Sequence, residues 1–261
     1  MSNLDLKGKA YYISGSSAGV GFAIAKTLAA RGAMVTISGR SAERGEQALM
    51  MLRAISDTCF FVAGDANDAA SVASNVADAV ACMGRLDGVV SAGAEGVVIP
   101  TPFADMTPAQ IEISFKSRLM PRILPVHAAI PALRQAGGGS VVMITTDAAR
   151  HVTPGESMIG AAGAAVVLLT KALARELGRD AIRVNSVAMT ITSDTPSWDR
   201  AFADDNFANH LFSKAIKRFP FGRAPNATEV AQAAAFLLSP ESSQISGQTL
   251  SVNGGLSFGG W

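Results

Sequence analysis

Cysteine is nearly absent from this sequence, since only Cys59 and Cys82 among 261 residues carry a thiol. Two cysteines exclude a disulfide framework and a cysteine-based metal motif, and so few thiols are typical of a protein from a reducing compartment. We therefore expect both to be small buried apolar residues and the protein to be cytoplasmic.

Charge is also sparse, because charged residues make up 16% of the chain, the net charge is +1 and the sequence has no basic cluster. This pattern argues against nucleic acid and anionic membrane surfaces as partners. The first ten residues, MSNLDLKGKA, lack a basic-then-apolar signal pattern. The longest apolar run, 158–169, is shorter than the roughly 18 residues of a membrane span. We expect a soluble protein whose partner is a small-molecule substrate or ligand.

The sequence does have a regular alternation of short apolar runs and longer segments with helical periodicity. Runs that are apolar throughout and separated by helices predict a parallel sheet covered on both faces. With 49% hydrophobic residues, the chain is predicted to be one α/β domain over 1–261, a doubly wound Rossmann sheet of about seven strands. The expected strands are 10–14, 33–38, 58–63, 87–92, 140–145, 182–187 and 248–252; the expected helices are 19–31, 41–54, 68–83, 107–135 with prolines interrupting it, 155–178 and 227–238.

One long segment, 189–222, does not follow this alternation. It comes after the sixth expected strand and contains Trp198, several charges and His210. Ligands of doubly wound folds bind beyond the carboxyl ends of the strands, so a segment of this length there predicts a substrate lid.

A glycine-rich turn, 14-SGSSAGVG-21, joins the first expected strand to the first expected helix. Its glycines let the backbone approach a pyrophosphate closely, and the helix that follows points its N-terminal N–H groups at the phosphates. A tight turn with a structural role only is the alternative. The predicted phosphate-binding residues are Gly15, Ser17, Ala18, Gly19, Val20 and Gly21.

The spacing G-x-x-x-G-x-G in this turn resembles that of the short-chain dehydrogenase/reductase family, and the resemblance runs nearly end to end. It implies a Rossmann fold and an NAD(P)(H)-dependent oxidoreductase acting on a small carbonyl or alcohol. The further segments that agree in order and spacing are 64-GDAND-68, 86-LDGVV-90, 139-GSVVMIT-145, 183-RVNSV-187, 221-FGRAPNATEVAQAAAFLLS-239 and 246-SGQTLSVNGG-255.

The resemblance implies a preference between the two dinucleotides. In NAD-preferring members an acid binds the ribose 2′-hydroxyl, but Gly39 occupies that position here and Arg40 follows it. A guanidinium is suited to a 2′-phosphate, and Ser17 is placed to add a hydroxyl. NADP(H) is therefore favoured over NAD(H), with a solvated Arg40 beside a helix cap as the alternative.

Later strands supply the rest of the implied cofactor site. Asp65 resembles the residue that accepts a hydrogen bond from the adenine amino group, with the backbone of Ala66 beside it. An N-cap or turn role is the alternative for Asp65. After the fourth expected strand the implied cofactor-binding residues are Ser91, Ala92 and Gly93, where the family's asparagine is missing.

The resemblance fails at the catalytic positions. Family members that reduce carbonyls use a tyrosine as acid and base, and a lysine one helical turn away lowers its pKa. A serine on the preceding strand and an asparagine on an earlier helix complete the set. Alignment without gaps on 168-LLTKALAREL-177 and the preceding strand places Ile159 at the tyrosine position, Gly163 at the lysine position, Thr146 at the serine position and Arg118 at the asparagine position.

Other groups are then the candidates for the missing chemistry. Arg118 could reach the space left by the lysine and hold a ribose or a substrate anion, although a guanidinium is no ordinary acid; an ion pair on an oligomer surface is its alternative. Histidine side chains in general titrate near neutrality, so His151 is the candidate proton carrier, unless it is merely solvated. Asp147 is a further candidate, and His127 and His210 are weaker ones. These residues show no metal-ligand spacing.

Three functions stay open at this point, because a fold alone does not decide among them. The first is an NADP(H)-dependent oxidoreductase with a displaced proton source. The second is a non-redox enzyme, an isomerase or lyase, on the same scaffold. The third is a catalytically inactive dinucleotide-binding sensor or scaffold subunit.

The resemblance also implies subunit contacts. In the family the helices at 155–178 and 118–135 form a dimer face and the C-terminal strand region forms a second one, which predicts a homo-oligomer, a dimer or tetramer. The helix at 155–178 has broad apolar coverage that agrees with this. A hetero-oligomer with an active relative and packing of this surface on the protein's own sheet are the alternatives.

Overall fold

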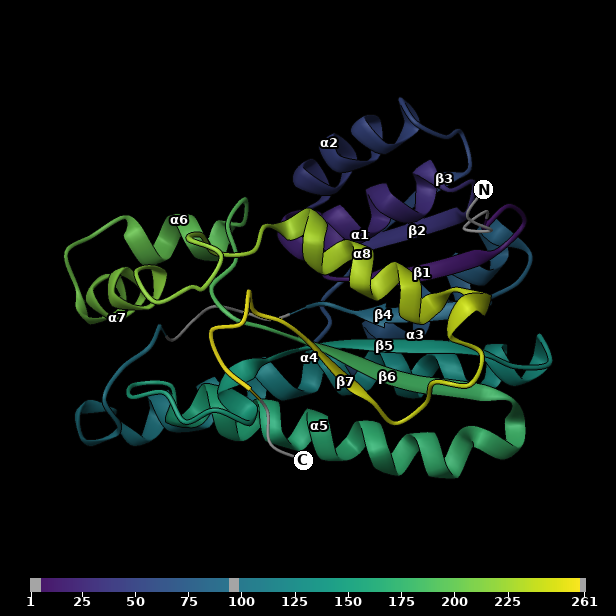
Figure 1. The fold of residues 1–261 in the computed structure, drawn as a ribbon. Coiled ribbons are helices and arrows are strands. Elements are labelled where there is room, and N and C mark those ends of the chain that lie inside the picture. Colours follow the sequence, from purple (N-terminus) through teal and green to yellow (C-terminus); the bar gives the residue numbers. More distant parts are fainter. Residues whose placement is uncertain (1–5, 94–98, 259–261) are drawn as a thin grey trace.

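The computed structural model describes residues 6–93 and 99–258. Within them seven parallel strands form one sheet in the order β3-β2-β1-β4-β5-β6-β7 (Figure 1). This confirms the predicted doubly wound sheet, while the single domain over 1–261 stays a prediction because the two ends and 94–98 lie outside the described residues. The strands are Ala10–Ser14 (β1), Met34–Gly39 (β2), Cys59–Ala63 (β3), Gly88–Ser91 (β4), Gly139–Thr146 (β5), Ile182–Met189 (β6) and Thr249–Val252 (β7).

Helices cover both faces of the sheet (Figure 1). One hydrophobic cluster lies between the sheet and α1, α2 and α8, and the other lies between the sheet and α3, α4 and α5. The apolar character of the strands on both faces follows from this double cover. The α-helices are Gly19–Ala30 (α1), Ala42–Arg53 (α2), Ala69–Met83 (α3), Pro108–Gln135 (α4), Ser157–Leu177 (α5), Pro196–Phe202 (α6), Phe207–Ile216 (α7) and Ala227–Leu238 (α8).

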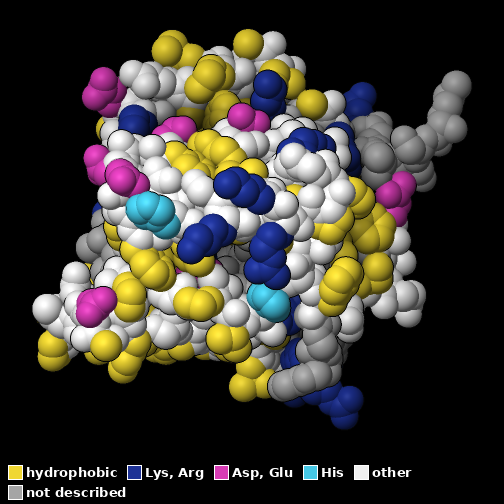
Figure 2. All heavy atoms as spheres, turned by 60° about the vertical axis from the view of Figure 1, so that its left-hand side comes forward, with side chains coloured by type: hydrophobic (Ala, Val, Ile, Leu, Met, Phe, Trp, Pro, Cys, Tyr) yellow, Lys and Arg dark blue, Asp and Glu magenta, His cyan; other side chains and the backbone are white. Residues whose placement is uncertain are grey.

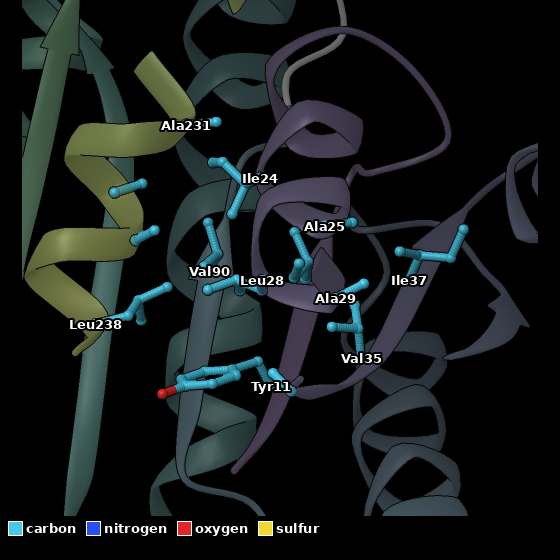
Figure 3. Packing of buried hydrophobic residues seen from close by; sticks show 14 of the residues in the cluster. Tyr11, Ile24, Ala25, Leu28, Ala29, Val35, Ile37, Val90, Ala231 and Leu238 are labelled. Carbon is cyan, nitrogen blue, oxygen red and sulfur yellow. The ribbon is translucent and has the colours of Figure 1, made fainter. Parts of the chain in front are cut away.

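The first cluster is built around α1, whose apolar residues recur at helical spacing. Ile24 and Leu28 are fully buried and lie between Ile37 of β2 and Ala231 of α8 (Figure 3). Tyr11 packs below them with 2% of its surface exposed. Each such side chain contributes about 1.5–3 kcal/mol through burial, so this cluster holds the glycine turn before α1 against a rigid support.

Helix α4 corrects one expectation, because it continues over 28 residues without interruption. Pro121, Pro125 and Pro131 lie inside it, and each removes one backbone donor at a cost of about 3 kcal/mol. Pro121 and Pro125 are buried, so packing against the sheet and the neighbouring helices compensates for the lost hydrogen bonds. The same packing carries the residues of α4 toward the carboxyl ends of the strands.

Helix α5 and the short turn after it, Ser157–Asp180, form the one described helix that is long and apolar enough to cross a membrane, and 28% of its most apolar window is buried. In this fold the helix lies along β5, β6 and α4 (Figure 1). Its buried face covers the sheet, and its opposite face leaves Leu168 69% exposed. Apolar residues therefore lie on both faces of the helix, and the described residues bury the face that packs on the sheet but not the face with Leu168.

The segment 189–222 contains two short helices, α6 and α7, which extend beyond the carboxyl ends of the strands (Figure 1). A small cluster of its own holds them, with Ile191 and Phe219 buried at its centre. Trp198 packs against Phe202 with ring centroids 4.6 Å apart. This is the position predicted for a substrate lid.

The predicted burial of both cysteines is half right. Cys59 is buried in β3, and burial raises the pKa of its thiol to about 11. Cys82 is exposed on α3, because the helix turns this position away from the sheet.

Candidate active site

The glycine turn after β1 meets the loop after β4 at the point where the strand order reverses, which is the usual ligand crevice of such sheets. A Cβ on Gly15 would lie 2.3 Å from Cα of Gly93, and one on Gly21 would lie 2.3 Å from the carbonyl oxygen of Gly15. Gly15 and Gly19 also have positive φ values of 70° and 58°. Side chains are therefore excluded, and backbone lines the crevice.

Helix α1 begins at this crevice with its N-terminal donors available. Its N-cap residue, Ala18, makes no side-chain capping hydrogen bond. Most helix termini are capped by a side chain, and an uncapped N-terminus attracts an anion through its N–H groups and dipole. Ser17, Ala18, Gly19, Val20 and Gly21 all line this groove, as the sequence predicts.

The end of β2 provides the basic side of the groove. A Cβ on Gly39 would lie 2.9 Å from the hydroxyl oxygen of Ser17, so that serine lies next to the position of the family's acid. Arg40 lines the groove, and so does Arg44 from the first turn of α2. Sequence reasoning missed Arg44, although it lies only four residues after Arg40, in the first turn of the helix that follows β2.

Asp65 and Ala66, which follow β3, line the same groove as these arginines. One of the carboxylate oxygens of Asp65 accepts hydrogen bonds from the backbone N–H of Asn67 at 2.9 Å and from the side-chain amide of Asn67 at 3.2 Å. The N-cap of α3 is Asp68. The N-cap alternative for Asp65 is therefore wrong, whereas its turn role and its place in the groove coexist.

Of the three residues predicted in and before the loop after β4, two line the groove and one does not. Ala92 and Gly93 line the groove beside Pro121 of α4. Ser91 is fully buried at the end of β4 and does not line it. We therefore assign the backbone after Ser91, and not its hydroxyl, to the groove.

A second cavity adjoins the groove below the lid. The two share a boundary made by five residues from β6, α4 and the start of α6. Figure 2 shows basic side chains and a histidine gathered around a hollow on this face of the molecule. The shared residues are Arg122, Met189, Thr195, Ser197 and Arg200.

All five predicted catalytic positions line this second cavity: Arg118, Thr146, His151, Ile159 and Gly163. Thr146 ends β5, and its hydroxyl oxygen accepts a hydrogen bond from the N–H of Ala148 at 3.2 Å. Because the oxygen of Thr146 accepts this hydrogen bond, the hydroxyl proton of Thr146 points away from Ala148. Ile159 brings only apolar surface to the wall. The four positions that the resemblance assigns to the family's catalytic residues therefore lie in one cavity. Of the four residues found there, only Thr146 has a hydroxyl group.

Gly163 does not provide room for another group, which corrects the interpretation of its side-chain loss. A Cβ there would lie 2.6 Å from the methyl carbon of Thr146 and 3.1 Å from Cβ of Ala149. The hydroxyl of Thr145 also donates a hydrogen bond to the carbonyl oxygen of Gly163 at 3.3 Å. The end of β5 therefore fills the space that a lysine side chain would start from.

This contact gives a prediction for the stability of variants at Gly163. We expect Gly163→Ala to lower the free energy of unfolding by about 1–2 kcal/mol, because overpacking outweighs the helix propensity of alanine. Thermal unfolding measures the change. Gly178→Ala is the matched control, since nothing lies within 4 Å of a Cβ at that end of α5. Equal stability of Gly163→Ala and the wild type would contradict the packing argument.

Arg122, which the sequence interpretation did not select, occupies the boundary between groove and cavity. Its Nε donates a hydrogen bond to the carbonyl oxygen of Ile144 at 2.5 Å, and its Nη1 donates one to the carbonyl oxygen of Arg118. Burial and repulsion from Arg118 lower the pKa of Arg122 to about 10. A second arginine of α4, one helical turn after Arg118, therefore lies between the groove and the cavity, and the role expected of Arg118 stays a prediction.

Glu156 is a second residue that sequence reasoning missed. It is the N-cap of α5, lines the cavity and lies three residues before Ile159. Burial raises the pKa of Glu156 to about 7, against the opposing effects of Arg118 and a hydrogen bond with Thr153. An acid one helical turn from the tyrosine position was the signal that could have identified it.

The other candidates for proton transfer differ in position. His151 is exposed at the cavity rim. His127 and His210 are exposed outside the residues that line either cavity, and His210 pairs with Asp205 at 3.3 Å. Among the described residues, no three His, Cys, Asp or Glu side chains gather as a metal site would require.

Asp147 lines the cavity but is engaged in a buried network. Its carboxylate accepts hydrogen bonds from the hydroxyls of Ser251 and Ser257, both at 2.9 Å, and from the side-chain amide of Asn253. Arg150 pairs with it at 3.4 Å. Asp147 therefore ties the segment after β7 to the end of β5.

Together the doubly wound sheet, the glycine turn and the groove that runs into a cavity define a dinucleotide-binding Rossmann protein. Residues 15–257 match a family model described as enoyl-(acyl carrier protein) reductase. The chain belongs to the short-chain dehydrogenase/reductase family.

Individual relatives cover almost the whole chain. A 3-oxoacyl-(acyl-carrier-protein) reductase from Chlamydia muridarum is 31% identical over 252 residues, which is 96% of this chain and 98% of the relative. The 7alpha-hydroxysteroid dehydrogenase of Escherichia coli K12 is 29% identical over 255 residues, 97% and 96% of the two chains. The relatives are short-chain oxidoreductases, as the resemblance implies.

Solved structures agree with this assignment. A 7 alpha-hydroxysteroid dehydrogenase in complex with NADH and 7-oxo glycochenodeoxycholic acid superposes with a TM-score of 0.88 at 28% identity, covering 97% of this chain and 96% of that one. A short-chain dehydrogenase/reductase from Mycobacterium ulcerans has the same TM-score at 26% identity, covering 96% and 90%. The use of NADH by one neighbour leaves the choice between the two dinucleotides to this chain's own residues.

Proposed function

We propose that the protein is an NADP(H)-dependent oxidoreductase acting on a small carbonyl or alcohol substrate, with a proton source other than tyrosine. The observation that carries this proposal is the continuity of the two cavities. A groove with backbone donors and arginines meets a more apolar cavity at Arg122 and Met189, and Thr146 lines that cavity. A dinucleotide in the groove would present its reactive end at this boundary.

The preference for NADP(H) rests on charge at the end of β2. Arg40 and Arg44 line the groove where a 2′-phosphate would lie, and Gly39, beside Ser17, has no acid that would favour NAD(H). Guanidinium groups bind phosphate through charge-assisted hydrogen bonds, which are about twice as strong as neutral ones. Asp65 in the same groove suits the adenine amino group.

At the other end of the groove, the bound dinucleotide would supply or accept a hydride. Arg122 would hold the ribose or phosphates beside the boundary through its remaining N–H groups. Thr146 would donate its hydroxyl proton to the substrate oxygen as a hydrogen bond, and Ile159 would exclude water from the reacting carbon. Arg122, Thr146 and Ile159 would thus position the dinucleotide and the substrate without a tyrosine. Another group must still supply the proton that the substrate oxygen takes up.

The test of this function is a turnover assay with purified wild-type protein. Saturated with NADPH, the protein is expected to oxidise the dinucleotide only when an aldehyde, ketone or quinone from a broad panel is added. Loss of the tyrosine's acid catalysis costs about 10²–10⁴-fold, so the assay needs enough enzyme to detect slow rates. A panel without any substrate-dependent oxidation would contradict the proposal.

The replacement of the family's tyrosine and lysine favours one other candidate function, that of an inactive dinucleotide-binding sensor or scaffold subunit. Ile159 and Gly163 are packed into the wall and offer no proton. This candidate predicts NADPH binding without turnover, whereas an isomerase or lyase would convert a substrate without dinucleotide oxidation. The turnover and binding experiments therefore separate all three.

We also propose that the protein is a homo-oligomer whose contact includes α5. The helix has an exposed apolar face that includes Leu168, and the family resemblance implies a subunit contact at this helix. We expect Leu168→Arg to shift the mass in solution toward the monomer, as measured by size-exclusion chromatography with light scattering. Met51→Arg, at an exposed apolar position of α2, is the matched control. An unchanged mass for Leu168→Arg would contradict this contact.

A cytoplasmic location remains a proposal. Two free cysteines, one of them exposed, suit a reducing compartment. Localisation of a tagged full-length chain by cell fractionation tests it.

A further inference from the structure

Among the residues that the structure describes, six titratable side chains line the cavity, and their chemistry leaves two candidate proton donors. Arg118, Arg122 and Arg200 line it but hold their protons too tightly to act as acids near neutrality. Asp147 is occupied by hydrogen bonds from Ser251, Asn253 and Ser257. That leaves Glu156 within the wall and His151 at the exposed rim.

Glu156 has the better position of the two. It is the N-cap of α5 and lies three residues before Ile159, so one helical turn separates the carboxyl from the position of the family's tyrosine. Glu156 and Ile159 line the same cavity as Thr146. Arg118 and Thr153, which both affect the pKa of this carboxyl, line the same cavity.

We propose that Glu156 is the proton donor of this active site and that its carboxyl group replaces the missing tyrosine from one turn earlier on α5. This inference rests on the proposed oxidoreductase function and names the acid that the function requires.

The proton balance of the reduction is simple. Hydride addition to the carbonyl carbon forms a C–H bond and breaks the π bond of the C=O group. The carbonyl oxygen takes the proton of the Glu156 carboxyl, which forms the alcohol O–H bond and leaves a carboxylate. Arg118 stabilises that carboxylate, and solvent reaching the cavity rim returns the proton. In the oxidation direction the Glu156 carboxylate accepts the proton of the alcohol.

The surroundings of Glu156 explain why it holds a proton near neutrality. Burial raises its pKa to about 7, although Arg118 on α4 and the hydrogen bond with Thr153 lower it. Arg122 and Arg200 add positive charge at the cavity boundary, His151 lies at the rim, and Asp147 adds negative charge on the wall. The rate of reduction is therefore expected to fall as the pH rises through about 7, and the rate of oxidation to rise.

The test compares Glu156→Gln with the wild type over pH 5.5–9, using the best substrate from the carbonyl panel. We expect kcat for reduction to fall by about 10²–10⁴-fold and its dependence on pH near 7 to disappear. The dissociation constant for NADPH is expected to change less than about 2-fold. Glu156→Asp should restore part of the rate with an altered pH profile, which a purely structural role would not produce. Glu176→Gln, at an exposed position of the same helix, is the control.

The outcomes separate the two proposals. A Glu156→Gln variant that keeps the wild-type kcat and pH profile overturns the role of Glu156 and leaves the oxidoreductase function intact. A wild-type protein that turns over no carbonyl overturns the proposed function and the role of Glu156 with it. Thermal unfolding of each variant verifies that the compared proteins are folded.

Discussion

Replacing Arg122 with methionine is expected to weaken NADPH binding by about 100-fold, which corresponds to about 2.7 kcal/mol. Arg122 lines both cavities and donates hydrogen bonds to the carbonyl oxygens of Ile144 and Arg118. Methionine fills a similar length but removes the side-chain hydrogen bonds to both carbonyl oxygens and the positive charge at the boundary of the groove. Fluorescence titration with NADPH measures the effect.

The control for this variant comes from the same helix. Arg134→Met removes a guanidinium that pairs with Asp180 at 2.8 Å near the far end of α4, where the arginine is 48% exposed. Surface pairs contribute at most about 1 kcal/mol, so NADPH binding should stay at the wild-type value. Arg122→Lys should recover only part of the affinity, because an ammonium cannot bond both carbonyls and a ligand in the same geometry. A dissociation constant for Arg122→Met within 2-fold of the wild type would contradict a role for Arg122 in dinucleotide binding.

Reversing the charge of Arg40 should change which dinucleotide the protein prefers. Arg40→Asp places a carboxylate next to Gly39, where it would repel a 2′-phosphate and accept hydrogen bonds from a ribose 2′-hydroxyl. We expect the affinity for NADPH to fall by about 10²–10³-fold, while the affinity for NADH stays equal or rises. Titrations of both dinucleotides on one preparation give the ratio directly.

Lys26→Asp provides the comparison for net charge, since it makes the same charge change at an exposed position of α1. Its ratio of affinities should match that of the wild type. If Arg40→Asp also keeps the wild-type ratio, the groove beside β2 does not read the 2′-phosphate and Arg40 is a solvated neighbour of the cap of α2.

The fold was largely predictable because its signals are local. Apolar runs at the strands and the glycine turn predicted all seven strands within one or two residues, and the segment 189–222 was recognised by its departure from the alternation. Helix α4 was the exception. Local rules place breaks at Pro121 and Pro125, whereas burial against the sheet keeps the helix continuous.

The sequence predicted those site residues whose place is set by the strand that they follow. The glycine turn, Arg40 and Asp65 lie in the groove because each directly follows a strand. Arg122 depends on the path of a side chain across α4 to two carbonyls, which no spacing encodes. The tight packing at Gly163 likewise depends on the methyl of Thr146, which arrives from another element.

Ile159 and Gly163 stand where the family has its tyrosine and lysine. In the structure both are packed parts of the cavity wall. Positive charge reaches the cavity boundary from α4 through Arg122, and an acid lies one turn earlier on α5 at Glu156. The site therefore holds a cation and an acid, each displaced from the family's position.

The most direct test of the central claim is a calorimetric titration of the wild-type protein with NADPH and with NADH. The account predicts one site per chain and an affinity for NADPH that is at least about 10-fold higher, the contribution of one charge-assisted contact of about 1.4 kcal/mol. Absence of binding by either dinucleotide would contradict the account, and a preference for NADH would contradict its assignment of Arg40 and Arg44.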